Sequence, residues 1–134
     1  MATVASVALT QPSSDPNIDQ GQTFTMGAQI TSALHGGLDY DIHYQWDQGI
    51  ATWVDIPSSG ADLTTADTNP EISASDSAEH TITITGVNAS TSNVRIRTVD
   101  HNDGDNEDLS GTQAVTVNAV ASSIPLVMAP YKPN

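Results

Sequence analysis

Residues 43–57 carry the stretch that decides the fold: His-Tyr-Gln-Trp-Asp-Gln-Gly-Ile-Ala-Thr-Trp-Val-Asp-Ile-Pro. Tyr44 and Trp46 are two positions apart, so both rings project from one face of an extended chain. A glycine-containing turn follows at 48–49, and Trp53 then begins a second alternating run. Two short strands around a turn, with a buried tryptophan on the first, are typical of the centre of a small β-sandwich. The sequence therefore predicts an all-β fold.

Alternating apolar and polar residues continue on both sides of this stretch, and turn residues separate the runs. We expect strands at 7–9, 23–31, 41–46, 51–56, 81–85, 94–99 and 114–118, with a short edge strand at 71–73. Strands spaced about ten residues apart predict an antiparallel two-sheet sandwich of about seven or eight strands. The alternation places Arg95 and Arg97 on the outer face and turns His43 away from the core.

The length of the chain, 134 residues, suits one compact domain with a tail. We expect a β-sandwich over 1–118 and an arm over 119–134. With no cysteine, the sandwich is free of disulfides and lacks zinc–thiolate chemistry. Residues 1–6 lack the basic region and apolar core of a signal peptide. Either the protein acts without classical secretion, or Met1 has replaced a leader.

The charge balance is strongly acidic, with 3 basic residues against 16 acidic ones. Arg95 is the first basic residue in the chain. Nucleic-acid binding and docking on anionic membranes both need Lys and Arg, so we exclude both kinds of partner. A surface of this charge favours solubility and suits exposure to a harsh medium.

The C-terminal arm differs in kind from the rest of the chain. Its prolines exclude a regular helix and disfavour a central strand. Two interpretations are open: a tail packed on its own domain or left unfolded, or an extended arm that binds a partner's groove or sheet edge. The second predicts contacts from the apolar side chains Ile124, Leu126, Val127, Met128 and Tyr131.

Residues 100–108 contain five carboxylates, and we expect an acidic loop there between the last two strands. Calcium takes six to eight oxygen ligands in irregular geometry. The loop therefore offers a calcium site whose ligands would be Asp100, Asp103, Asp105 and Asp108. The spacing is not that of an EF-hand, and the alternative is a solvated loop without an ion. We expect no other cofactor.

No arrangement typical of an enzyme is recognisable. The four histidines are spread over separate segments without metal-ligand spacing, and nucleophile elbows and phosphate-binding loops are absent from the sequence. We therefore expect no catalysis. Trp53 has two interpretations: packing, over Trp46 or at a sandwich edge, or a platform on which a sugar ring stacks.

Five fragments in order resemble a known family. They are Val-Ala-Leu-Thr-Gln-Pro (7–12), Gly-Gln-Thr-Phe-Thr-Met (21–26), Tyr-Gln-Trp (44–46), Trp-Val-Asp-Ile-Pro (53–57) and Val-Arg-Ile-Arg-Thr-Val (94–99). Together, over about residues 4–118, they resemble immunoglobulin-like modules of bacterial surface proteins and tailed-phage virions. The resemblance implies that Trp46 is the core tryptophan, with Tyr44 beside it. It also implies that Ile96 and a residue near Ala28 occupy positions where disulfide-bonded members have cysteines.

The resemblance implies binding or display rather than catalysis. Our first hypothesis is a structural protein that decorates a phage capsid or tail and is anchored by its terminal arm to other virion proteins or to copies of itself. The alternative is a bacterial or archaeal cell-surface adhesin module or filament subunit, which would be extracellular. A weaker third is a carbohydrate-binding module that recognises a glycan at a host surface.

Overall fold

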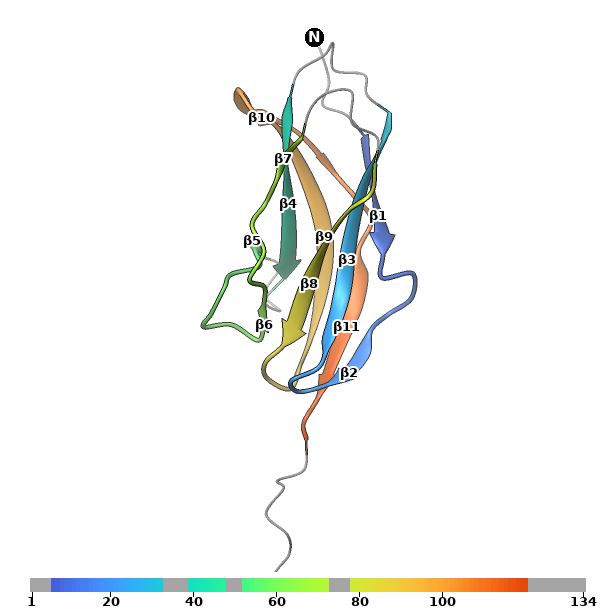
Figure 1. Ribbon diagram of the computed structural model, residues 1–134, viewed down its shortest axis with the longest axis vertical. Coiled ribbons are helices and arrows are strands. Elements are labelled where there is room, and N and C mark those ends of the chain that lie inside the picture. Colours follow the sequence, from blue (N-terminus) through green and yellow to red (C-terminus); the bar gives the residue numbers. More distant parts are fainter. Residues whose placement is uncertain (1–5, 33–38, 48–51, 73–77, 121–134) are drawn as a thin grey trace, which may run out of the picture.

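Eleven strands in the described residues form two sheets that pack face to face. The computed structural model describes residues 6–32, 39–47, 52–72 and 78–120. In chain order the strands are β1 (Ser6–Gln11), β2 (Asn17–Asp19), β3 (Thr23–Ser32), β4 (Tyr40–Asp47), β5 (Trp53–Asp55), β6 (Leu63–Thr64), β7 (Glu71–Ile72), β8 (His80–Gly86), β9 (Ser90–Asp100), β10 (Asp103–Leu109) and β11 (Gln113–Asn118). The long strands run along the long axis, and β1 begins near the end opposite to the one where β11 ends (Figure 1).

The two sheets have different sizes. One has four strands in the order β1-β3-β8-β6. The other has seven strands, in the order β2-β11-β9-β4-β5, with β10 paired to β9 and β7 paired to β4. The described pairs are antiparallel except β11 with β2, which is parallel. Within these described segments, no helix is long and apolar enough to cross a membrane.

One hydrophobic core lies between the sheets. From β4, the side chains of Tyr40, Ile42, Tyr44 and Trp46 are buried, as the alternation predicts. The expected core residues are almost fully enclosed: Tyr44 is 1% exposed, Trp46 3% and Ile96 0%. The Tyr44 hydroxyl donates a hydrogen bond to the carbonyl of His80 over 2.8 Å, which joins the two sheets. Ala28 is likewise fully buried.

The expected strands are present with shifted ends. Those predicted from clear alternation are confirmed, and β9 and β4 extend beyond their predicted limits. The strand expected at 51–56 is only three residues long, as β5. Sequence reasoning missed β2 and β6, because strands of two or three residues carry no periodic signal.

The prediction of a loop over 100–108 is wrong. Residues 103–109 form β10, which pairs with the end of β9 in a register that places Asp108 opposite Thr98 and Leu109 opposite Arg97. Aspartate, asparagine and glycine are poor strand formers. Here the partner edge of β9 supplies the hydrogen bonds, and tertiary pairing overrides the local preference.

β10 and β11 together form one interrupted strand along β9. The register shifts by one residue between the two, since Leu109 lies opposite Arg97 and Gln113 opposite Val94. Ser110 closes the interruption: its amide donates to the carbonyl of Ile96 over 2.9 Å, and its hydroxyl oxygen accepts from the Ile96 amide over 2.8 Å. The side chain replaces a ladder bond at this bulge.

Side-chain oxygens cover backbone amides at strand positions that face no neighbouring strand. Each accepts a hydrogen bond from an N–H group that would otherwise be open at a sheet edge. The pairs are Val7 with Asp108 (2.9 Å), Thr83 with Asp67 (3.0 Å), Ala114 with Asp15 (3.3 Å) and Tyr44 with Asn69 (3.2 Å). At these positions the edges are closed to strand addition.

Candidate binding face

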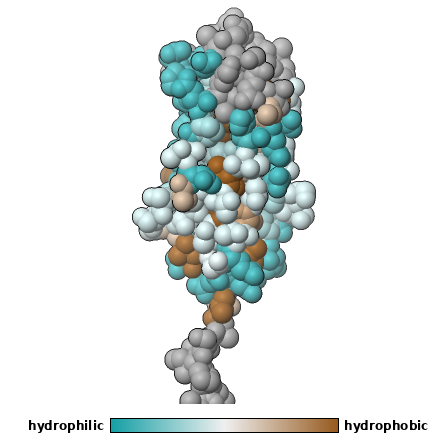
Figure 2. Space-filling view, viewed as in Figure 1, coloured by the Kyte–Doolittle hydropathy of each residue, from teal (hydrophilic) through white to brown (hydrophobic). Residues whose placement is uncertain are grey.

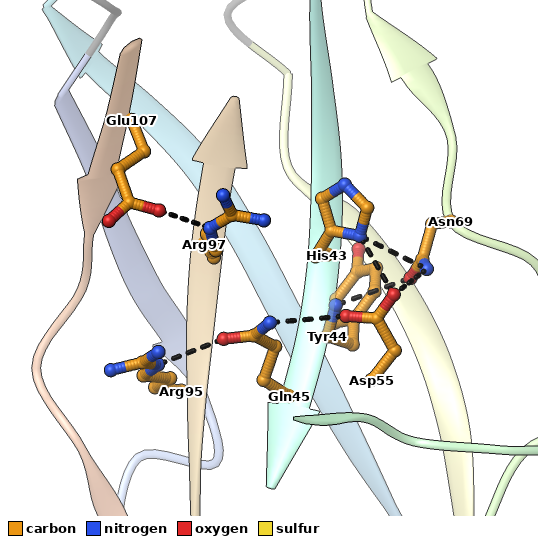
Figure 3. A network of polar contacts seen from close by, with 8 residues as sticks. All are labelled: His43, Tyr44, Gln45, Asp55, Asn69, Arg95, Arg97 and Glu107. Atoms are coloured by element: carbon orange, nitrogen blue, oxygen red, sulfur yellow. Dashed lines mark hydrogen bonds and ion pairs between the residues drawn. The ribbon is translucent and has the colours of Figure 1, made fainter. Parts of the chain in front are cut away.

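The outer face of the seven-stranded sheet gathers the polar and aromatic side chains that alternate with the core residues. On β4 these side chains include His43 and Gln45, and on β9 they are Arg95 and Arg97. The predicted outward direction of His43, Arg95 and Arg97 is thus confirmed. The register places Gln45 opposite Arg95 on one side and Asp55 on the other. Figure 3 shows the resulting network across β9, β4 and β5.

Asp55 is the hub of this network. Its Oδ2 accepts hydrogen bonds from His43 Nδ1 over 2.9 Å and from the Asn69 amide over 3.3 Å. Its Oδ1 accepts from Gln45 Nε2 over 3.2 Å. The hydrogen bond from His43, with smaller contributions from Gln45 and Arg97, outweighs partial burial and lowers the pKa of Asp55. The carboxylate therefore stays ionised at neutral pH and holds β5 and the 69 segment against β4.

Arg95 is oriented by neutral groups. Its Nε donates to Gln45 Oε1 over 3.0 Å, and its guanidinium lies 4.3 Å from the centre of the Trp53 ring. Partial burial lowers the pKa of Arg95, which remains charged. The Trp53 ring thus packs under a cation on the outer face, in a stacked arrangement that favours both groups. A sugar ring could not stack on the side that Arg95 occupies.

Arg97 differs from Arg95 in its partner. Its Nε forms an ion pair with Glu107 of β10. Within the described chain, Arg95 forms no such pair with a carboxylate. The face therefore presents one neutralised arginine and one arginine held by an amide and an aromatic ring.

The residues predicted to bind calcium do not share one environment. Asp100 is buried, and its Oδ1 accepts from the backbone amide of Asn102 over 2.9 Å. Asp108 accepts from the amide of Val7. Asp103 and Asp105 lie on β10, but the structure describes only their backbone and not their side chains. The calcium site stays a prediction.

The predicted partner-binding residues of the arm lie outside the described residues, which end at 120. They are Ile124, Leu126, Val127, Met128 and Tyr131. Their role also stays a prediction.

Sequence reasoning missed a second cluster, Asp41, Glu71 and His101. His101 Nδ1 lies 3.0 Å from Asp41 Oδ1, and His101 Nε2 lies 3.8 Å from Glu71 Oε2. The hydrogen bond to Asp41 and the nearby charge of Glu71 raise the pKa of His101. No local spacing marks these residues, because strand pairing and a turn bring them together from distant parts of the sequence.

Comparison with known proteins identifies the fold and no more. No protein-family model matches the sequence, and no curated protein matches it. Among the solved structures that share its architecture are the chaperone–tip adhesin complex of CFA/I fimbriae, at 12% identity and a TM-score of 0.54, and the class 5 fimbriae chaperone CfaA, at 12% identity and a TM-score of 0.51. The matches cover 87% and 85% of this chain and 57% of each of those chains. The fold is immunoglobulin-like.

A further solved structure is similar at a lower TM-score. The PKD domain of an M14-like peptidase from Thermoplasmatales archaeon SCGC AB-540-F20 is 16% identical, with a TM-score of 0.46, over 87% of this chain and 94% of that one. At such identities, immunoglobulin-like sandwiches are shared by proteins of many functions. The function must therefore be argued from the surface of this molecule.

Proposed function

We propose that this protein is a non-enzymatic display module that decorates a phage capsid or tail and is anchored by its C-terminal arm. The observation that carries the proposal is the covering of strand edges by Asp15, Asp67, Asn69 and Asp108. Where edge amides are already bonded in this way, pairing with another chain gains little. This favours attachment through the arm over attachment through the sheets.

The end of the molecule where β11 finishes supports the same proposal. Val87 and Val120 are 40% and 54% exposed. Gln20 joins them, since its Nε2 donates to the Val87 carbonyl over 3.2 Å and its Oε1 accepts from the Val120 amide over 3.1 Å. Figure 2 shows hydrophobic residues near this end as well as at the middle of the same face. The exposed valines beside the point where the arm begins could add to its contact with a larger assembly.

The outer face of β9, β4 and β5 would then remain available on the displayed body. Tryptophan and arginine are the residue types that contribute most to protein interfaces. Trp53 and Arg95 stack on one another at 4.3 Å and are held in place by the hydrogen bond to Gln45. A rigid face of this composition favours recognition of a partner over chemical conversion of a substrate.

Truncation after Asn118 tests the proposal. We expect residues 1–118 to fold as a monomer, with the same circular dichroism and melting temperature as the full chain. When each protein is co-expressed with the capsid and tail proteins of its phage, only the full chain should sediment with particles. Equal incorporation of the truncated chain would overturn the anchoring role of the arm.

The main alternative is a cell-surface adhesin module or a filament subunit, and strand exchange distinguishes the filament form from our proposal. A subunit that exchanges strands would form filaments from the purified full chain, visible by electron microscopy. As a matched control, the double variant Asp67→Ala, Asp108→Ala exposes the amides of Thr83 and Val7. We expect the wild type to stay monomeric and the double variant to associate more readily. Filaments of the wild type would support the alternative.

A further inference from the structure

Three metal-ligating side chains from three separate segments meet at the end of the sandwich where β4 begins. They are Asp41 of β4, Glu71 of β7 and His101 of the turn between β9 and β10. One ligand atom from each lies within 4.8 Å of the other two. Figure 1 places these elements together near the end opposite to the exit of β11.

Backbone hydrogen bonds fix this arrangement. Asp41 and Glu71 are directly opposite one another in the β4–β7 register. The amide of His101 donates to the carbonyl of Asp39 over 3.0 Å, which ties the β9–β10 turn to the start of β4. The three side chains are therefore presented by paired strands and an anchored turn.

The pairing of β4 with β7 places two carboxylates side by side, an arrangement that a nearby cation stabilises. Like charges directly opposite across a strand pair are destabilising, and Asp41 and Glu71 form such a pair. The imidazole of His101 faces both carboxylates, at 3.0 Å from Asp41 Oδ1 and 3.8 Å from Glu71 Oε2. A divalent ion bound by one imidazole nitrogen and by one oxygen of each carboxylate would neutralise both carboxylates.

We propose that Asp41, Glu71 and His101 form a binding site for a divalent transition-metal ion of the zinc type. Zinc is bound by imidazole nitrogen and carboxylate oxygen at about 2.0–2.2 Å, which places tetrahedral ligand atoms about 3.4 Å apart. His101 Nδ1 lies 3.0 Å from Asp41 Oδ1, and one ligand atom from each of the three residues lies within 4.8 Å of the others, so small side-chain movements would reach that spacing. The three groups are partly exposed, so water can take the fourth position.

The nitrogen ligand separates this site from the calcium site predicted at Asp100, Asp103, Asp105 and Asp108. Calcium prefers oxygen ligands only, six to eight in number, whereas imidazole suits zinc, nickel and copper. The two proposals involve different residues and different ions. Each therefore survives or fails independently of the other, and this one does not depend on the proposed display function.

Isothermal titration of the untagged full chain with zinc chloride and with calcium chloride tests the site. We expect one zinc ion per chain and at least about tenfold weaker zinc binding in His101→Gln and in Glu71→Gln, since losing even an indirect partner of a metal commonly costs 10–100-fold. His80→Gln, on β8 of the other sheet, is the matched control and should bind zinc like the wild type.

Cobalt binding gives a spectroscopic test that depends on metal coordination itself and not on the stability of the fold. Co²⁺ bound at this site should give a visible absorption band that is lost in His101→Gln, while circular dichroism shows both proteins folded. Absence of zinc binding overturns the proposal, as does an unchanged zinc affinity in both ligand variants. Calcium binding that equals zinc binding and depends on His101 would overturn the choice of ion.

Discussion

The inner and outer faces of the seven-stranded sheet are built on the same strands, but they are stabilised in different ways. On β4 the inner face presents Ile42, Tyr44 and Trp46, which are buried in the core. The outer face of the same strand presents His43 and Gln45, which bond across to neighbouring strands. The first set is held by apolar packing, whereas the second set, in which His43 is partly exposed and Gln45 is buried, is held by hydrogen bonds.

This difference separates what holds the fold from what is free to serve binding. Burying a large apolar side chain contributes about 1.5–3 kcal/mol. Partly exposed ion pairs contribute about 0–1 kcal/mol. The outer face can therefore change with little loss of stability. The stacked Arg95–Trp53 pair and the Asp55 network are therefore open to substitutions that test binding.

The largest expected effect comes from the inner face. Ile96→Ala removes a fully buried side chain from β9, and we expect the free energy of unfolding to fall by about 2–5 kcal/mol because a cavity remains. Urea denaturation of both proteins measures the difference. Arg97, the next residue but on the outer face, provides the matched control.

Arg97→Ala removes the ion pair with Glu107, and we expect a loss of no more than about 1 kcal/mol. If Arg97→Ala lowered the free energy of unfolding as much as Ile96→Ala, the outer network would be a main source of stability. The two faces would then contribute to stability in similar amounts.

The sequence predicts the fold where its signal is local. Alternation over Tyr44 and Trp46 correctly identifies which face of β4 is buried, because period two follows directly from strand geometry. It fails where pairing is decided by distant residues. β10 is a strand because β9 offers it an edge, and nothing in the acidic stretch 100–108 encodes that edge.

The candidate site is predictable to a smaller extent. Alternation gives the outward direction of His43, Arg95 and Arg97, but it does not show what they contact. Asp41 and His101 are 60 positions apart, and only the pairing of β4 with β9 and the turn after β9 bring them together. Contacts at such separation follow from register, and a single sequence does not give the register.

A smaller effect is expected at Tyr44, whose hydroxyl group crosses from one sheet to the other. Tyr44→Phe keeps the buried ring and removes the hydroxyl that bonds to the His80 carbonyl. We expect the free energy of unfolding to fall by about 1–3 kcal/mol, because a partly buried hydrogen bond is lost. Thermal denaturation at neutral pH measures the loss. An unchanged melting temperature would show that this bond contributes nothing to holding the two sheets together.

The smallest expected effect is at Asp55, and its pH dependence sharpens the comparison. Because hydrogen bonding lowers the pKa of Asp55 below its ordinary value of about 4, its ionised form stabilises the folded state above that pH. Asp55→Asn should therefore cost less than about 1 kcal/mol at neutral pH, since the side chain is partly exposed. The difference between the two proteins should shrink as the pH falls below about 4, where the wild-type carboxylate also becomes neutral. Urea denaturation of both proteins from about pH 7 to about pH 2.5 measures this. A difference that persists at the lowest pH would mean that Asp55 stabilises the outer face by its shape and not by its charge, and the two faces would then be more alike than their chemistry suggests.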